Sequence, residues 1–238
     1  MIINHSSITM PEIENESVHA VITSPPYPMI QKWDECFEEQ GAPVDFEQQH
    51  KILDRVWEEC DRVLIPGGIM AINVGDATRS IDGNFQCYPN YARITMECCE
   101  WLKLNHLIPI FWKKISNRPN AFLGSGFLPV NAYVSQDCEF IMIFRKGSIR
   151  KFKKDEVQKR RDSAFTKEER DKWFSQIWEI QGEKGSGEHS GWPKEIFYRL
   201  MRMFSIEGDT ILDPFCGRGN EDTAIENGRN YIGFEIGG

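Results

Sequence analysis

The sequence predicts an α/β fold with an open, mostly parallel sheet that is covered by helices on both faces. Ala20-Val21-Ile22 is a short apolar run typical of a buried parallel strand, and it ends at Ser24-Pro25-Pro26-Tyr27. Residues 208–235 give a strand, a Gly-rich turn, a short helix, a strand and a carboxylate, which is the order of a nucleoside-binding βαβ unit. Between these stretches, an amphipathic helix is followed by another apolar strand.

Length and composition fit one large α/β domain with an insertion, or a domain and a half, because the chain has 238 residues, 40% of them hydrophobic and 27% charged. No apolar run reaches the ~18 residues of a membrane span, and the first residues lack the pattern of a signal peptide. The seven cysteines contain no Cys-x-x-Cys pair, so neither a disulfide framework nor a zinc site is expected. Because no disulfides are expected, the predicted compartment is a reducing cytoplasm.

The middle of the chain alternates helices and strands. Apolar spacing predicts a helix over Glu47–Leu64, which Pro66-Gly67-Gly68 ends, and then a buried strand over Ile69–Val74. Tyr27–Gln40 and Thr78–Asn90 are expected to be loops. Further elements are a helix over Tyr91–Leu104, strands over Asn105–Lys113 and Glu139–Phe144, and a helix over Lys194–Phe204.

The Ser24-Pro25-Pro26-Tyr27 stretch suits binding of a flat, polar ring. Two prolines remove two backbone donors, so the strand must stop there and the segment is held stiff. Ligands of open parallel sheets bind at the carboxyl ends of the strands. A hydroxyl and an aromatic ring at that place can hold a nucleobase; the plainer alternative is a strand-ending turn.

A second motif, Asp213-Pro214-Phe215-Cys216-Gly217-Arg218-Gly219, follows a short apolar strand. About twenty residues later comes Glu235, at a position where an acid accepts from ribose hydroxyls. Asp222 stands where a dinucleotide-binding fingerprint has its third glycine, so a nicotinamide or flavin oxidoreductase is disfavoured.

Together the two motifs resemble those of the S-adenosylmethionine-dependent amino-methyltransferases of DNA, which carry (D/N/S)-P-P-(Y/F) and D-P-F-x-G-x-G. The tetrapeptide comes first in this chain and the cofactor loop near the end, which is the circularly permuted β order. The resemblance implies a Rossmann-like methyltransferase fold with a small inserted target-recognition region. It divides the chain into a catalytic half, 1–144, an insertion, 145–188, and a cofactor-binding half, 189–238.

The resemblance also implies roles for the motif residues. Ser24 Oγ and the Pro25 carbonyl would accept hydrogen bonds from an exocyclic amine, with Pro26 stiffening the segment and Tyr27 stacking on a flipped-out base. The methyl donor would be S-adenosylmethionine, and no metal is needed. The residues implied to bind it are Asp213, Pro214, Phe215, Gly217, Gly219, Glu235, His189 and Pro193.

Ser at position 24 favours N4 of cytosine over N6 of adenine in this family, and N6 methylation stays the alternative. Methylation at cytosine C5 needs a Pro-Cys nucleophile, and the chain contains no such dipeptide. A methyltransferase of protein glutamine is disfavoured by its opposite motif order. From another class, the alternative is a DNA-binding relative with impaired catalysis, because the helix after Gly219 is short and places Glu221 and Asp222 near the cofactor pocket.

Residues 145–172 form a basic block in an acidic protein. They contain twelve Lys or Arg against six Asp or Glu, whereas the whole chain has a net charge of −8. A charge run is usually a solvated face, but this one occupies the target-recognition position of the family. It is therefore expected to contact the phosphates of double-stranded DNA through Lys151, Lys153, Lys154, Lys159, Arg160 and Arg161.

The expected setting follows from the same resemblance. It is a prokaryotic restriction–modification system, with a cytoplasmic enzyme associated with the nucleoid through DNA, a cognate restriction endonuclease as a possible partner, and a monomer or homodimer as the assembly. No membrane association is expected.

Overall fold

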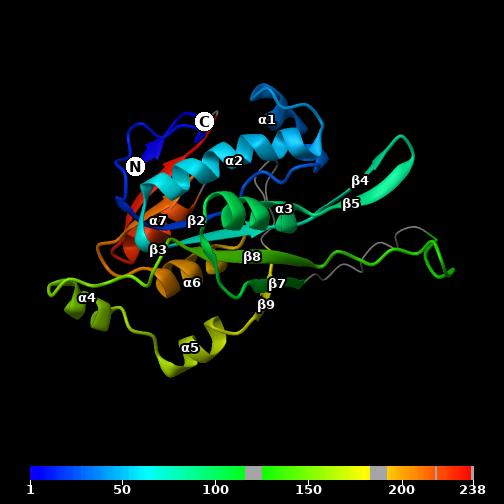
Figure 1. Ribbon diagram of the computed structural model, residues 1–238. Helices are drawn as coiled ribbons and strands as arrows, with labels where there is room; N and C mark the ends of the chain where they lie inside the picture. Colours follow the sequence, from blue (N-terminus) through cyan, green and yellow to red (C-terminus); the bar gives the residue numbers. More distant parts are fainter. Residues whose placement is uncertain (116–124, 183–191, 218, 237–238) are drawn as a thin grey trace.

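The computed structural model describes residues 1–115, 125–182, 192–217 and 219–236. Its centre is a mixed sheet with the strand order β1-β11-β10-β2-β3-β8-β7-β9, to which β6 adds by pairing with β8 (Figure 1). The prediction of an open, mostly parallel α/β sheet is confirmed. The strands are β1 (Ile2–Ile3), β2 (Val18–Thr23), β3 (Leu64–Val74), β6 (Asn105–His106), β7 (Ile110–Ile115), β8 (Cys138–Arg145), β9 (Ile177–Gln181), β10 (Thr210–Asp213) and β11 (Asn230–Phe234).

The strand directions bring the two motifs together. β10 and β2 are parallel neighbours, with Ala20 opposite Ile211 and Val21 opposite Leu212. The edge of the sheet where β2, β3 and β10 end is called the carboxyl edge below, and the opposite edge the amino edge. β8 runs antiparallel to β3, so β8 begins at the carboxyl edge and ends at the amino edge.

Helices cover both faces of the sheet and divide its side chains into two cores. Val21 faces a core built with α2 (Phe46–Val63) and α3 (Asn90–Met96), which continues into the π-helical turn η2 (Glu97–Trp101). Ala20 and Ile22 face the other core, built with α6 (Lys194–Phe204) and α7 (Asn220–Glu226). This alternation is the period of two expected of a strand buried on both sides. None of the helices in the described ranges is long and apolar enough to cross a membrane.

The segment after β3 is a hairpin and not the predicted loop. β4 (Ala77–Ile81) and β5 (Asn84–Tyr88) pair in antiparallel register and stand out from the body of the molecule (Figure 1). Asp82 and Gly83 both have positive φ, 50° and 78°, as a two-residue hairpin turn requires. The Asp-Gly pair was the available signal for this turn.

Two other segments depart from the sequence prediction. The region after Tyr27 folds into a 3-10 turn, η1 (Gln31–Trp33), and a short helix, α1 (Asp34–Glu39), in place of a loop, because Phe37 is buried in the core beneath it. The strand predicted over Asn105–Lys113 is split into β6 and β7, and Pro109, which cannot donate to a ladder, lies in the gap.

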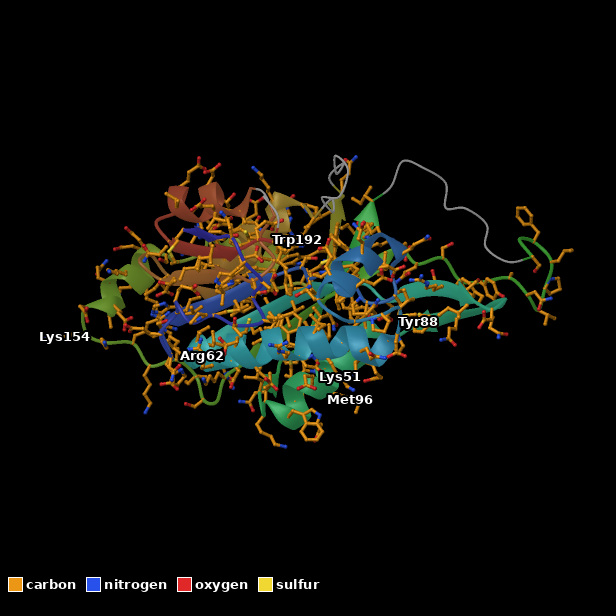
Figure 2. All side chains as sticks on the ribbon, turned by 90° about the horizontal axis from the view of Figure 1, so that it is seen from above. Lys51, Arg62, Tyr88, Met96, Lys154 and Trp192 are labelled. Carbon is orange, nitrogen blue, oxygen red and sulfur yellow. The ribbon has the colours of Figure 1, made fainter. Side chains whose placement is uncertain are left out.

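The basic block contains two short helices, α4 (Glu156–Asp162) and α5 (Lys167–Trp173). It leaves β8 at the amino edge and stays there, because Arg150 pairs with Asp209 at 2.6 Å just before β10 begins. Ser163 Oγ likewise accepts from the Glu207 amide at 3.1 Å. In Figure 2, Lys154 lies at one end of the molecule, well away from Tyr88 at the end of β5.

Candidate active site

The two motifs are joined by a buried hydrogen bond. Thr23 Oγ1, at the end of β2, donates to Asp213 Oδ1 at 2.7 Å across 190 residues of sequence. Asp213 also accepts from Asn220 Nδ2 at 3.0 Å and from the Phe215 amide at 3.3 Å. Its side chain is 1% exposed, and burial raises the pKa of this carboxyl to about 6. Both oxygens of Asp213 thus hold protein groups, and they fix the Gly-rich turn against the end of β2.

Ser24 and Tyr27 belong to a second network at the same edge. The Ser24 Oγ and Tyr27 hydroxyl oxygens are 3.0 Å apart, and the Tyr27 hydroxyl donates to Glu139 Oε2 at 2.9 Å. Asn73 Nδ2 donates to the Tyr27 oxygen at 2.8 Å and to Glu139 Oε2 at 2.6 Å. Burial raises the pKa of Tyr27 well above its usual value, so the hydroxyl stays neutral and bridges Ser24 to Glu139.

A further buried pair holds the loop that carries the tetrapeptide. Asn90 Nδ2 donates to the carbonyls of Pro28 at 3.2 Å and Gly75 at 3.0 Å, so it ties the chain after β2 to the chain after β3. His50 Nε2 lies 2.9 Å from Asn90 Oδ1 and fixes the amide. Burial lowers the pKa of His50 to about 3, so this ring is neutral and acts as the donor. The loop geometry is therefore set before any ligand binds.

A pocket of about 220 Å³ opens beside this network. Its aromatic walls are flanked by two cations, because Lys32 Nζ lies 4.3 Å from the Trp33 ring centre and Lys114 Nζ lies 5.2 Å from that of Trp112. The buried Trp192 Nε1 has no hydrogen-bond partner among the described residues. Such walls suit a planar, polar ring. The lining is Pro25, Tyr27, Ile30, Lys32, Trp33, Trp112, Lys114, Glu139 and Trp192.

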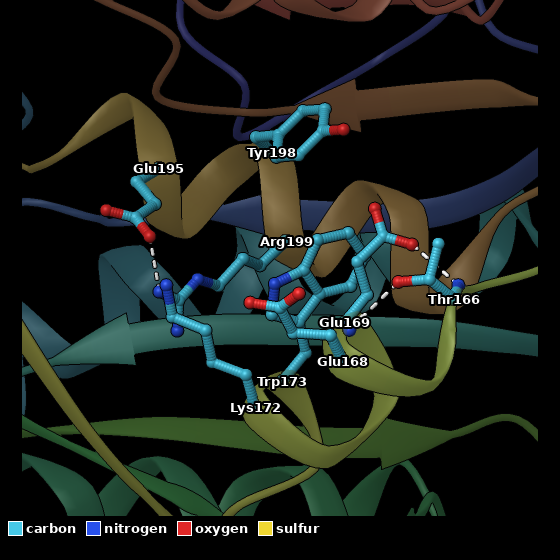
Figure 3. Close-up of a pocket in the computed structure, with 8 residues that line it drawn as sticks. All are labelled: Thr166, Glu168, Glu169, Lys172, Trp173, Glu195, Tyr198 and Arg199. Carbon is cyan, nitrogen blue, oxygen red and sulfur yellow. Dashed lines mark hydrogen bonds and ion pairs between the residues drawn. The ribbon is translucent and has the colours of Figure 1, made fainter.

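A larger pocket of about 340 Å³ lies between α5 and α6 (Figure 3). It holds no residue of either motif, and its wall of mixed charges includes Arg199 paired with Glu195. The smaller pocket is the candidate active site because it adjoins Ser24 and Tyr27. The larger pocket is lined by Thr166, Glu168, Glu169, Lys172, Trp173, Glu195, Tyr198 and Arg199.

The Gly-rich turn has the conformation expected of a backbone that approaches a ligand closely. Gly217 and Gly219 have φ of 50° and 114°, and a Cβ at Gly219 would lie 2.9 Å from Lys194 Cε. The Gly217 amide donates to Glu235 Oε2 at 2.8 Å, so the predicted ribose-binding acid stands beside the turn. The residues present fit a nucleoside cofactor, because glycine backbone and one carboxylate converge at this edge.

The other predicted cofactor residues lie around that turn. Phe215, which follows Pro214, packs edge-on against Trp57 with ring centres 6.1 Å apart, and Pro193 is the buried N-cap of α6. His189 falls outside the described residues. Glu221 accepts from the Met1 amino group at 2.8 Å, so its carboxylate forms an ion pair with the N-terminus beside β1.

Sequence reasoning missed the partners of Ser24 and Tyr27. Asn73, Lys114 and Glu139 come from β3, β7 and β8, and only the pairing of those strands brings them together. One signal was present, because Glu139 is a carboxylate at the start of an otherwise apolar strand. Charged residues are rarely buried unless they are paired, so this position could have been singled out, although its partners could not.

This arrangement, with a tetrapeptide and a Gly-rich turn at the carboxyl edge of a Rossmann-like sheet, defines the class of S-adenosylmethionine-dependent DNA methylases. The chain belongs to the DNA methylase family whose model, N6_N4_Mtase, matches residues 18–237.

Known proteins similar to this chain include M.MjaI, a type II methyltransferase of Methanocaldococcus jannaschii. It is 52% identical over 256 residues, covering 95% of this chain and 84% of the relative. M.MthZI, a type II methyltransferase of Methanothermobacter thermautotrophicus, is 42% identical over 253 residues, covering 97% of this chain and 71% of the relative.

Two solved structures share the fold. The putative DNA modification methylase TTHA0409 of Thermus thermophilus, complexed with S-adenosyl-L-methionine, has a TM-score of 0.77 at 30% identity, covering 99% of this chain and 88% of its own. The cytosine-N4-specific PvuII DNA methyltransferase has a TM-score of 0.71 at 16% identity, covering 99% of this chain and 81% of its own. At that identity the likeness to the PvuII enzyme concerns the fold alone.

Proposed function

We propose that this DNA methyltransferase transfers the methyl group of S-adenosylmethionine to the exocyclic N4 amine of a flipped-out cytosine. S-adenosylmethionine is the cofactor of the family, and a relative of this fold is complexed with it. The observation that carries the proposal is the position of Ser24 Oγ, 3.0 Å from the Tyr27 oxygen beside an aromatic pocket. The type II names of the relatives favour a restriction–modification system as the setting.

The chemistry requires an acceptor for the amine. The lone pair of a ring-conjugated amine is delocalised, and hydrogen bonds accepted from its two N–H groups localise that pair on nitrogen. Ser24 Oγ and the Pro25 carbonyl supply the acceptors, and the walls of the 220 Å³ pocket hold the base. The Gly-rich turn and Glu235 hold the cofactor at the same edge, and alignment of two bound reactants can contribute about 7–11 kcal/mol.

DNA must approach the carboxyl edge, because the target base has to reach Ser24. Lys32 and Lys114 line the pocket and are both exposed, so they are placed to meet the phosphates beside the flipped nucleotide. The six predicted DNA-contacting residues of 145–172 lie at the amino edge, so any phosphates that they contact belong to DNA farther from the target base.

The test is nucleoside analysis of DNA incubated with the protein and S-adenosylmethionine. N4-methylcytosine is the expected product. N6-methyladenine would establish the alternative specificity, which the family model equally accommodates. Binding of DNA and cofactor without any methylated nucleoside would identify an impaired relative.

A further inference from the structure

We propose that Glu139 is the terminal proton acceptor of the methyl transfer, reached from Ser24 through the Tyr27 hydroxyl. This inference rests on the proposed function and adds a route for the proton that the reaction must release. Methyl transfer forms the N–C bond, breaks the S–C bond and leaves the amine nitrogen with one proton too many. No carboxylate belongs to the tetrapeptide itself, so a carboxylate acceptor has to come from elsewhere in the fold.

The hydrogen bonds have a single consistent direction. The Tyr27 hydroxyl donates its proton to Glu139 Oε2 at 2.9 Å, and Asn73 Nδ2 donates to the Tyr27 oxygen at 2.8 Å. The Tyr27 oxygen therefore has to accept from Ser24, 3.0 Å away. With its proton directed to Tyr27, Ser24 Oγ accepts a long hydrogen bond from Asn73 Nδ2 at 3.5 Å and offers its other lone pair to the N–H of the target amine.

The same chain can carry the proton away. The amine gives its proton to Ser24 Oγ as Ser24 gives its own to Tyr27 and Tyr27 gives its own to Glu139. Both hydroxyls are neutral before and after, and Glu139 becomes a carboxylic acid that later loses the proton to solvent. The raised pKa of Tyr27 is compatible with this shuttle, since no free tyrosinate has to form.

The setting of Glu139 suits an acceptor. Glu139 is 8% exposed. Its other oxygen, Oε1, pairs with Lys114, whose side chain is 42% exposed. The titratable groups facing Glu139 are Tyr27, Lys32 and Lys114. Asn73 donates to the same oxygen of Glu139 as Tyr27 does and fixes the carboxylate in place.

The decisive variant is Glu139→Gln, because glutamine still offers an oxygen to the Tyr27 hydroxyl but cannot take up a proton at neutral pH. We expect the single-turnover methylation rate to fall by about 100-fold or more, with cofactor and DNA affinity unchanged. In the wild type the rate should decrease in acid as the acceptor becomes protonated, and this acid limb should be absent from the variant. Glu179→Gln, on β9 beside Lys113, is the matched control and should keep the wild-type rate.

Tyr27→Phe is the second variant, because it removes the bridging hydroxyl and keeps the ring. It should slow methylation to a similar extent, and the Tyr27→Phe/Glu139→Gln double variant should be no slower than the slower single variant. Folding of each variant is checked by thermal melting and cofactor binding. If the wild type methylates DNA and both single variants do so at its rate, the relay is wrong and the proposed function stands. If the wild type transfers no methyl group to DNA, the proposed function itself fails.

Discussion

The two edges of the sheet use their polar groups in opposite ways. At the carboxyl edge, Ser24, Tyr27, Asn73 and Glu139 form a largely buried network whose every distance is fixed by packing. At the amino edge, the six predicted DNA-contacting residues of 145–172 are all exposed. Fixed, desolvated groups suit a reaction that needs defined geometry, whereas exposed charges attract DNA without positioning it. Charge density therefore does not locate the chemistry in this protein.

The largest expected effect comes from Ser24→Ala, which removes an acceptor at the carboxyl edge. An acceptor used mainly in the transition state is worth about 2.7–4 kcal/mol by analogy with oxyanion-hole donors. Single-turnover methylation should therefore slow by roughly 100- to 1000-fold, while DNA and cofactor affinities stay near those of the wild type. A variant that methylates at the wild-type rate would reduce Ser24 to a turn residue.

Tyr27→Ala should slow methylation at least as much as Tyr27→Phe, because it also removes the bridging hydroxyl, and it should have a smaller, additional effect on binding. Loss of stacking on the flipped base costs about 1–3 kcal/mol, so binding of DNA with an intact target should weaken along with the rate. The control is DNA with an abasic target site, which offers no base to stack. Equal weakening on both substrates would show that Tyr27 acts only on the fold.

Much of the fold could be predicted, and the reasons are local. The helices over 47–64 and 194–204 and the strands before Ser24 and Asp213 follow from apolar spacing, and the structure confirms them. The chemical roles of both motifs were also predicted from residues that are adjacent in the sequence. The network around Tyr27 could not be predicted, because Asn73 and Glu139 lie 46 and 112 residues away and meet it through strand pairing.

The position of the basic block could not be predicted from the sequence either. An apolar run predicts a strand but not its direction, and β8 runs antiparallel to β3. That direction carries residues 145–172 to the amino edge, away from Ser24.

Salt titrations of DNA binding test whether the lysines of the carboxyl edge contact phosphates. Replacing Lys32 and Lys114 with glutamine should weaken binding and reduce the slope of log K against log salt by up to about 1.8, since each phosphate contact adds about 0.9. Lys51→Gln, an exposed lysine on α2, is the control. An unchanged slope in the double variant would remove these two lysines from the DNA surface.

The amino edge is tested by replacing Lys159, Arg160 and Arg161 with alanine. We expect weaker binding and a flatter salt dependence with a long duplex, but little change with a short duplex that covers only the carboxyl edge. If the salt slope with the long duplex is unchanged, the basic block is a solvated face.

The smallest expected effect concerns folding stability in acid. Burial lowers the pKa of His50 to about 3, while an unfolded histidine has a pKa of about 6.5. Below pH 6.5 the unfolded chain takes up a proton that the folded chain excludes, so His50 should cost about 2 kcal/mol of stability at pH 5 relative to pH 8. His50→Gln should remove this loss, and Tm measured at both pH values will show it. His5→Gln is the control, because the hydrogen bond to Glu12 raises the pKa of His5 and its removal should not abolish the loss. A wild-type Tm difference retained in His50→Gln would contradict this assignment.

The most direct test is photocrosslinking of DNA that carries 5-iodocytosine at the methylated position. The base should enter the aromatic pocket, so the crosslinked peptides should contain Tyr27, Trp33, Trp112 or Trp192. The crosslinks should require the target sequence and should survive in Ser24→Ala, which keeps the pocket intact. Crosslinks confined to residues 145–172 would place the target base at the amino edge and contradict the account.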